Sequence, residues 1–149
     1  MTEILEQAVN QNRHIYDLTI EYEMNEYKKS REEIVQEIKN RLKIMRDAAI
    51  EGVTNPVKTK SGMVVGNAHK FFEYSHQNKL LGPVLNKAVA YSLAVAEVNA
   101  AMGVIVAAPT AGSCGIIPGI LFSLNEEVDS SEEKLVNGFL TSSGLGLYI

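Results

Sequence analysis

Hydrophobic positions recur at helical spacing through the first third of the chain. Ser30 and Glu33 form a capping box, in which each side chain binds the other residue's backbone N–H at a helix start. One apolar stripe follows at the spacing of a helix face: Ile34, Ile38, Leu42, Met45 and Ala49. Gly52 and Pro56 end this pattern, which predicts a long amphipathic helix after Ser30. A shorter, more polar helix is predicted before it from Ile15, Leu18 and Tyr22.

The pattern changes in the second half of the chain. Residues 53–67 predict a loop, whereas Val84–Met102 is rich in alanine and aliphatic residues, with Lys87 and Glu97 as its only charges. A helix that is apolar nearly all round is typically buried among other helices. Residues 104–108 fit either a short buried strand or a further helical turn, since periodicity does not distinguish the two.

The remaining residues predict a loop, two helices and a turn. The loop is Pro109–Gly115, a short helix lies around Pro118–Leu124, and Asn125–Asp129 is an acidic turn. A second capping box at Ser130 and Glu133 begins the last helix, which continues through Leu135, Val136, Phe139 and Leu140. The prediction is an all-α fold with a buried layer of apolar helices, residues 1–149 forming one domain. Because residues 84–149 offer few polar positions, they are expected to expose apolar surface unless more chain, a partner subunit or a second copy covers it.

Composition and charge narrow the classes of protein. A net charge of −4 argues against a nucleic-acid binder, which usually carries a clustered basic face. The longest uncharged run, Val98–Asn125, is broken by prolines and glycines and does not resemble a membrane span. Residues 1–11 carry acids and no apolar segment, so no secretory signal is expected. A single cysteine forms no internal disulfide, which fits the reducing cytoplasm.

The densest candidate chemistry lies in the run Ala107–Gly119, which contains the only cysteine, Cys114. Glycine permits close backbone approach, and a helix start favours an anion such as a thiolate, so Cys114 is a candidate metal ligand. The alternative is an inert packing residue. Just before it, four residues are candidates for binding a substrate carboxylate through backbone N–H groups and hydroxyls, the alternative being a plain loop with capping roles: Thr110, Ala111, Gly112 and Ser113.

A second group of candidates lies in or beside the loop before residue 70. Lys60, Ser61 and Asn67 are further substrate-binding candidates, and His69 is a candidate for a catalytic base by residue type. The alternative is an ordinary solvated connection. Glu97 and Asn99 are polar residues in the apolar helix. Glu97 is either a functional group or a partner for Lys87, and a structural role is preferred because isolated buried polar groups are usually satisfied locally.

Three segments resemble a known family. Ser61–Gly62, the run Ala90–Ala100 and above all Ala107–Gly119 are similar to the alpha chain of bacterial iron–sulfur L-serine dehydratase, also called L-serine ammonia-lyase. The resemblance covers essentially the whole sequence, most specifically at Pro109–Gly115, and spans about the N-terminal half of the family's alpha chain.

The resemblance implies an activity, a cofactor and a partner. L-serine would be converted to pyruvate and ammonia, without pyridoxal phosphate, by a [4Fe–4S] cluster held by three cysteines, with its open iron acting as a Lewis acid. Cys114 matches the first ligand, and the other two would lie beyond residue 149. A separate beta chain would complete the enzyme as a hetero- or homo-oligomer.

One cysteine and three scattered histidines do not complete a cluster site. Three hypotheses therefore stand. The chain is the N-terminal part of a serine dehydratase alpha chain, inactive alone; or it is a truncated, non-catalytic remnant that serves oligomerisation or partner docking; or it is a small-molecule binding domain that uses residues 110–113 as an anion cradle.

Overall fold

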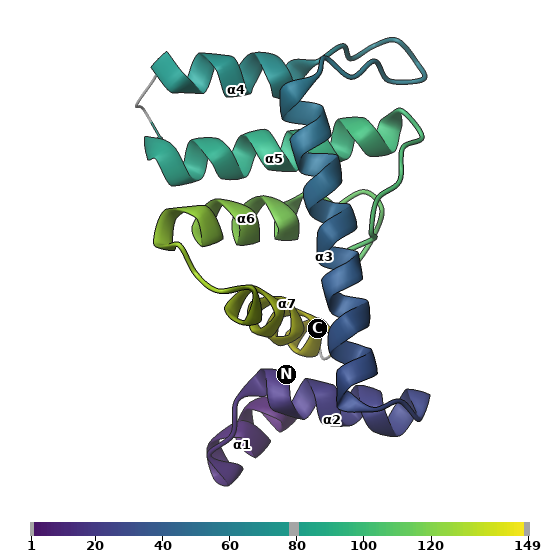
Figure 1. The fold of residues 1–149 in the computed structure, drawn as a ribbon, viewed down its shortest axis with the longest axis vertical. Helices are drawn as coiled ribbons and strands as arrows, with labels where there is room; N and C mark the ends of the chain where they lie inside the picture. The colour runs from purple at the N-terminus through teal and green to yellow at the C-terminus, as the bar shows by residue number, and fades with distance from the viewer. Residues whose placement is uncertain (1, 78–80, 148–149) are drawn as a thin grey trace. The chain divides into compact units, whose positions relative to one another are not determined.

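A computed structural model describes residues 2–77 and 81–147, which fold as helices joined by irregular loops (Figure 1). Pairing between extended segments in these residues is limited to an isolated bridge of Lys58 with Val65, which confirms the all-α prediction. The helices are α1 (Thr2–Gln11), α2 (Ile15–Tyr27), α3 (Arg31–Thr54), α4 (Asn67–Gln77), α5 (Gly82–Ala100), α6 (Ile116–Val128) and α7 (Glu132–Gly146). None of these helices is long and apolar enough to cross a bilayer.

The chain divides into two compact units. The first contains the residues up to Asn40 and those from Ser131 onward, and the second contains residues 41–130. The long helix α3 therefore contributes its first part to one unit and its remainder to the other. The assignment of residues 1–149 to one family domain stays a prediction.

In the first unit, α2 packs against both α1 and α7. The crossing of α2 and α7 is close because Gly144 faces Thr19, whose hydroxyl would clash with any Cβ at position 144. Thr19 is itself buried, and its hydroxyl donates to the Ile15 carbonyl at 2.9 Å, which satisfies it within its own helix. Buried apolar side chains complete this core: Ile4, Leu18, Ile20, Val136, Phe139 and Leu140.

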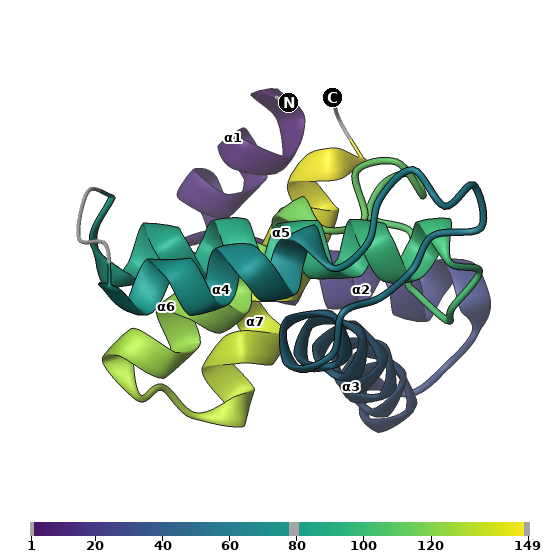
Figure 2. The same ribbon diagram turned by 90° about the horizontal axis from the view of Figure 1, so that it is seen from above.

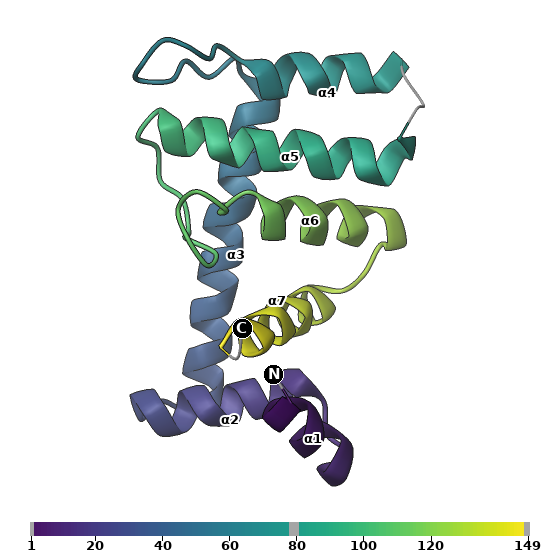
Figure 3. The same ribbon diagram turned by 180° about the vertical axis from the view of Figure 1, so that it is seen from behind.

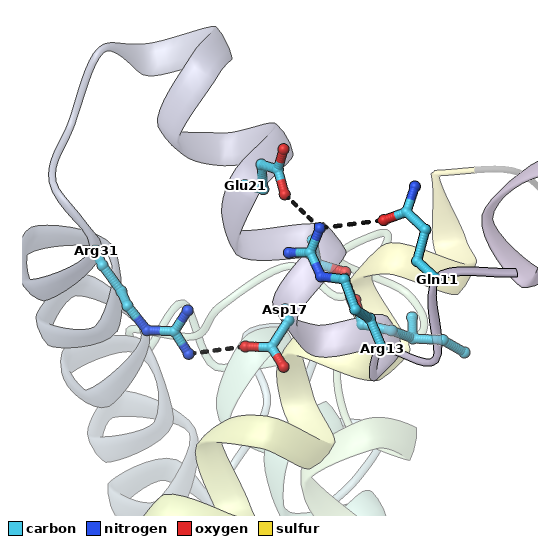
Figure 4. Close-up of polar contacts among 7 residues, drawn as sticks. Gln11, Arg13, Asp17, Glu21 and Arg31 are labelled. Atoms are coloured by element: carbon cyan, nitrogen blue, oxygen red, sulfur yellow. Dashed lines mark hydrogen bonds and ion pairs between the residues drawn. The ribbon is translucent and has the colours of Figure 1, made fainter. Parts of the chain in front are cut away.

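Ion pairs on the surface join consecutive helices of this unit (Figure 4). Arg13, in the α1–α2 connection, pairs with Glu21 at 2.7 Å and donates to Gln11 at 3.3 Å. Arg31, the first residue of α3, pairs with Asp17 of α2 at 2.9 Å. Since these groups are largely solvated, each pair is expected to contribute less than about 1 kcal/mol.

The capping box before α3 is confirmed. The Ser30 N–H donates to Glu33 Oε2 at 2.7 Å, and the Glu33 N–H donates to Ser30 Oγ at 3.2 Å. These hydrogen bonds favour the charged carboxylate and lower the pKa of Glu33. The apolar stripe from Ile34 to Ala49 is buried as the pattern predicts.

In the second unit, α4 and α6 lie on either side of α5 (Figures 1 and 3). The prediction that α5 is buried among helices is confirmed for one side of it, where Ala90, Tyr91 and Ala94 are nearly inaccessible, whereas Leu85 and Leu93 are exposed. A Cβ at Gly119 of α6 would lie 2.6 Å from the Ala88 carbonyl of α5. Small residues at this interface, Gly115 among them, therefore allow α5 and α6 to pack closely. The sequence analysis interpreted the glycines near Cys114 as positions where the backbone approaches a ligand, and did not include this packing role.

Several predicted boundaries are wrong. Helix α6 continues to Val128, so residues 125–128 form its last turn, and the turn is confined to Asp129, which has a left-handed backbone at φ +43°. The N-cap of α7 is Ser131 and not Ser130: its hydroxyl accepts the Lys134 N–H, while the Ser130 hydroxyl donates to Asn125 Oδ1 at 2.8 Å. Residues 104–108 form neither a strand nor a helical turn. Helix α4 was not predicted.

A buried phenol links α5 to α6. The Tyr91 hydroxyl donates to Glu126 Oε1 at 2.9 Å, and Lys87 pairs with the same carboxylate at 3.0 Å. Burial, followed by the hydrogen bond to Glu126 and its charge, raises the pKa of Tyr91 to about 12.

This shift predicts a pH dependence. Because the folded pKa lies above the unfolded value of about 10, the stabilisation is fully present below pH 10 and is lost as pH rises towards 12. In an ultraviolet titration of the six tyrosines, the difference between wild type and Tyr91→Phe is expected to titrate near pH 12. A difference that titrates near pH 10 would contradict it.

Candidate functional site

Two of the candidate segments meet at the last turn of α5. The Lys60 N–H donates to the Ala100 carbonyl at 3.1 Å, and Asn99 Nδ2 donates to the Ala111 carbonyl at 3.0 Å. The loop before α4 and the loop before α6 are therefore attached to the same end of one buried helix (Figure 2). Asn99 is a polar residue in an apolar helix, and its partner 12 residues away is set by tertiary packing.

A third segment is attached there by Glu97. Its Oε1 accepts the backbone N–H groups of Asn67 and Ala68 at 2.8 and 3.1 Å. Those amides begin α4 and have no intrahelical partner, so Glu97 caps this helix from 30 residues away. The expected pairing of Glu97 with Lys87 is wrong, since Lys87 pairs with Glu126. Only one oxygen of Glu97 is satisfied, and by amides distant in sequence: Oε2 is buried with no hydrogen-bond partner among the described residues.

The loop from Thr110 to Ser113 is closed by its own hydroxyls. Thr110 Oγ1 and Ser113 Oγ are 3.0 Å apart, the Ser113 N–H donates to Thr110 Oγ1, and Ser113 Oγ donates to the Ala108 carbonyl. This is the capping arrangement named above as the alternative. Ala111 and Gly112 are exposed residues, and no hydrogen bond from their backbone N–H groups is found within the described part of the chain. No Cβ contact closer than 3.8 Å would block position 112.

Cys114 is fully buried, two residues before α6 begins. Burial raises the pKa of its thiol, so the thiolate expected at a helix start is not favoured in the isolated chain. A bound metal would be needed to hold the sulfur deprotonated. No group of three or more His, Cys, Asp or Glu residues in the described ranges is arranged to hold a metal ion. The described residues therefore show no complete set of ligands for a cluster, and Cys114 remains a candidate for a single ligand.

His69 is half-buried in the first turns of α4. Its Nδ1 lies 2.8 Å from the Val53 carbonyl. Because a carbonyl only accepts, Nδ1 carries the proton in this contact, and the neutral ring has its lone pair on Nε2. No hydrogen bond joins His69 to residues 110–114 in the part of the chain that the structure describes.

The other candidates in or beside the loop before α4 differ in exposure and in hydrogen bonding. The Ser61 hydroxyl lies 3.3 Å from the buried Thr59 hydroxyl and accepts the Met63 N–H, so it is used inside the loop. The Lys60 side chain is exposed and has no ion pair among the described residues. Asn67 contributes its backbone to the Glu97 contact and has an exposed side chain.

An apolar groove of about 420 Å³ lies between α5 and α6. Leu81, Leu85, Ile120 and Leu124 line it and are each about half exposed. Outside the groove, Met102 and Val104 are more exposed still. The expectation that the second half of the chain exposes apolar surface is therefore confirmed for the described residues.

Two relatives are similar to this chain over almost all its length. It is 37% identical over 148 residues to the L-serine dehydratase alpha chain of Peptoniphilus asaccharolyticus, covering 99% of this chain and 51% of that protein. It is 34% identical over 148 residues to the probable L-serine dehydratase alpha chain of Bacillus subtilis strain 168, covering 99% and 49%. The chain thus spans about half the length of these curated relatives.

More distant matches are shorter. L-serine dehydratase TdcG of Escherichia coli K12 is 42% identical over 57 residues, or 38% of this chain and 13% of that protein. No solved structure matches. The family described as serine dehydratase alpha chain matches residues 10–149, which is nearly the whole sequence. This chain belongs to the serine dehydratase alpha chain family.

Proposed function

We propose that this chain forms part of an L-serine ammonia-lyase, which converts L-serine to pyruvate and ammonia, and that it is inactive alone. The observation that carries the proposal is the attachment of three candidate segments to one turn of α5, in a chain whose similarity to named alpha chains extends over 99% of its length. The cytoplasm is the proposed compartment, because a chain with a single cysteine forms no internal disulfide, which fits reducing conditions.

The proposed reaction assigns roles to residues at this end of α5. The N–H groups of the exposed residues Ala111 and Gly112 bind the substrate carboxylate, as backbone donors near a helix start bind anions. Lys60, whose backbone N–H bonds the Ala100 carbonyl, adds a positive charge to this end of α5. His69 Nε2 takes the α-proton and the bond between the β-carbon and the hydroxyl breaks. The protonated His69 then returns this proton to the departing hydroxide, which leaves as water. The aminoacrylate tautomerises to an imine, and water hydrolyses the imine to pyruvate and ammonia.

For the cofactor, we propose that Cys114 supplies one thiolate to a [4Fe–4S] cluster and that the other thiolates come from polypeptide outside this sequence, which has no second cysteine. A beta chain is the proposed partner. This division of ligands agrees with the lack, among the described residues, of any group of three or more His, Cys, Asp or Glu side chains that could hold a metal ion.

A chimera tests the proposal. Residues 1–149 replace the matching part of the Peptoniphilus alpha chain, which is produced anaerobically with its beta chain and supplied with iron and sulfide. Bound iron and sulfide, visible absorbance and serine-dependent pyruvate are measured for the chimera and for this chain alone. We expect a cluster and turnover in the chimera and neither in the chain alone. Turnover by the chain alone would contradict the division of the site.

A second candidate function rests on the apolar groove between α5 and α6. In this alternative, the chain is a non-catalytic module that associates with a second copy of itself. The same preparations separate the two candidates: a stable chimera without cluster or turnover, together with self-association of the chain alone, would favour the module.

A further inference from the structure

We propose that Glu97 is a positioning residue of the candidate site, which fixes the start of α4 relative to the loop before α6. This inference rests on the proposed function. Glu97 is the one acid buried in α5, at 5% exposure, and its Oε1 binds the two amides that begin α4. Those amides belong to Asn67 and Ala68, directly before the candidate base His69.

The attachments are concentrated in a very short stretch of helix. Glu97 binds α4, Asn99 binds the loop of residues 109–114, and the Ala100 carbonyl binds the loop that carries Lys60. These three residues span about 5 Å along the helix axis, at about 1.5 Å per residue. Glu97 contacts Asn67, 30 residues before it, and Asn99 contacts Ala111, 12 residues after it. One turn of α5, the helix that packs against both α4 and α6, thus holds segments that are distant in sequence.

The type of contact makes the position of α4 precise. A carboxylate that accepts two N–H groups at a helix start combines charge-assisted hydrogen bonds with the positive end of the helix dipole. His69 is held from its other side by the Val53 carbonyl of α3. The ring is therefore fixed through its own backbone and through Nδ1, and a displacement of about 1 Å at a reacting group can reduce a rate by about 100-fold.

The first experiment measures amide exchange in this chain by NMR and requires no turnover. In Glu97→Ala, the Asn67 and Ala68 amides are expected to exchange about 10- to 100-fold faster than in wild type, beyond any change in amides of the α5 centre. In Glu97→Gln, the amide oxygen still accepts both N–H groups but without the charge, and exchange should lie between wild type and Glu97→Ala. Exchange in Glu97→Ala at the wild-type rate, or exchange in Glu97→Gln as fast as in Glu97→Ala, would overturn the proposal.

The second experiment measures serine turnover in the chimera. Glu97→Ala is expected to reduce kcat/KM by about 10- to 100-fold, with substantial recovery in Glu97→Gln. The matched control is Tyr91→Phe, which removes a buried polar contact of the same helix to α6 and should leave kcat/KM within about threefold. Faster amide exchange in Glu97→Ala with unchanged kcat/KM would reduce Glu97 to a structural cap and overturn the positioning role.

Asn99→Ala is a second variant, which is useful if the protein does not fold with a substitution at the buried Glu97. It removes the contact with the Ala111 carbonyl and should reduce kcat/KM about tenfold while the Asn67 and Ala68 amides exchange normally. An unchanged kcat/KM here would show that the last turn of α5 does not organise the site. If the wild-type chimera itself lacks turnover, the proposed function fails, while the exchange experiment still decides whether Glu97 holds α4.

Discussion

Replacing Cys114 with serine in the chimera is expected to prevent cluster assembly and abolish serine turnover. A hydroxyl has nearly the same size as the thiol but is a poor ligand for the irons of a cluster, which thiolates hold. The loss of activity should exceed the decrease of about 10- to 100-fold that is typical when a residue hydrogen-bonded to a metal ligand is removed. Iron and sulfide per chain, visible absorbance and pyruvate formation are measured together under anaerobic conditions.

Ser123→Ala is the control for this substitution. Ser123 is as inaccessible as Cys114 and lies on the adjoining helix, where its hydroxyl donates to the Ile120 carbonyl at 3.0 Å. Its loss perturbs the same core without touching the proposed ligand, and the cluster should persist. A Cys114→Ser chimera that keeps its iron and its turnover would show that Cys114 is a packing residue.

Phe122→Ala is expected to lower the free energy of unfolding by about 3–5 kcal/mol, the range typical of removing a buried aromatic side chain. Phe122 is 1% exposed in α6, and the Arg46 guanidinium lies 4.7 Å from its ring centre. The substitution removes both the buried apolar surface and this cation–π contact. Since small domains are stable by about 5–15 kcal/mol, such a loss leaves little margin. Urea denaturation followed by far-ultraviolet circular dichroism measures it.

Leu124→Ala is the matched control, two residues along the same helix. Leu124 is 47% exposed at the groove, so its truncation should change the free energy of unfolding by less than about 1 kcal/mol. Phe122→Leu, which keeps most of the volume, should fall between the two. Equal losses in Phe122→Ala and Leu124→Ala would contradict the placement of Phe122 in the core.

The sequence alone determined those features that depend on neighbouring residues. The capping box at Ser30 and Glu33 and the apolar stripe that ends near Ala49 are confirmed, because hydrogen bonds at a helix start and hydrophobic periodicity are local properties. The burial of α5 is confirmed for one side of the helix. The family also followed from sequence, through the segment around Cys114. The sequence determined the ends of the helices less well. Two adjacent serines both suit the N-cap of α7, and only the tertiary structure shows that it is Ser131 and not Ser130.

The tertiary structure decided how the candidates are joined. The sequence showed that Glu97 needed a partner, but its partners are backbone amides 29 and 30 residues away, which carry no side-chain signal. The same is true of Asn99 and the Ala111 carbonyl. The sequence predicted that the helix start would favour a thiolate at Cys114. Burial opposes this, because desolvation raises the pKa of the Cys114 thiol. Composition and periodicity identified the chemical groups, whereas their attachment to one turn of α5 depends on long-range packing that no local pattern encodes.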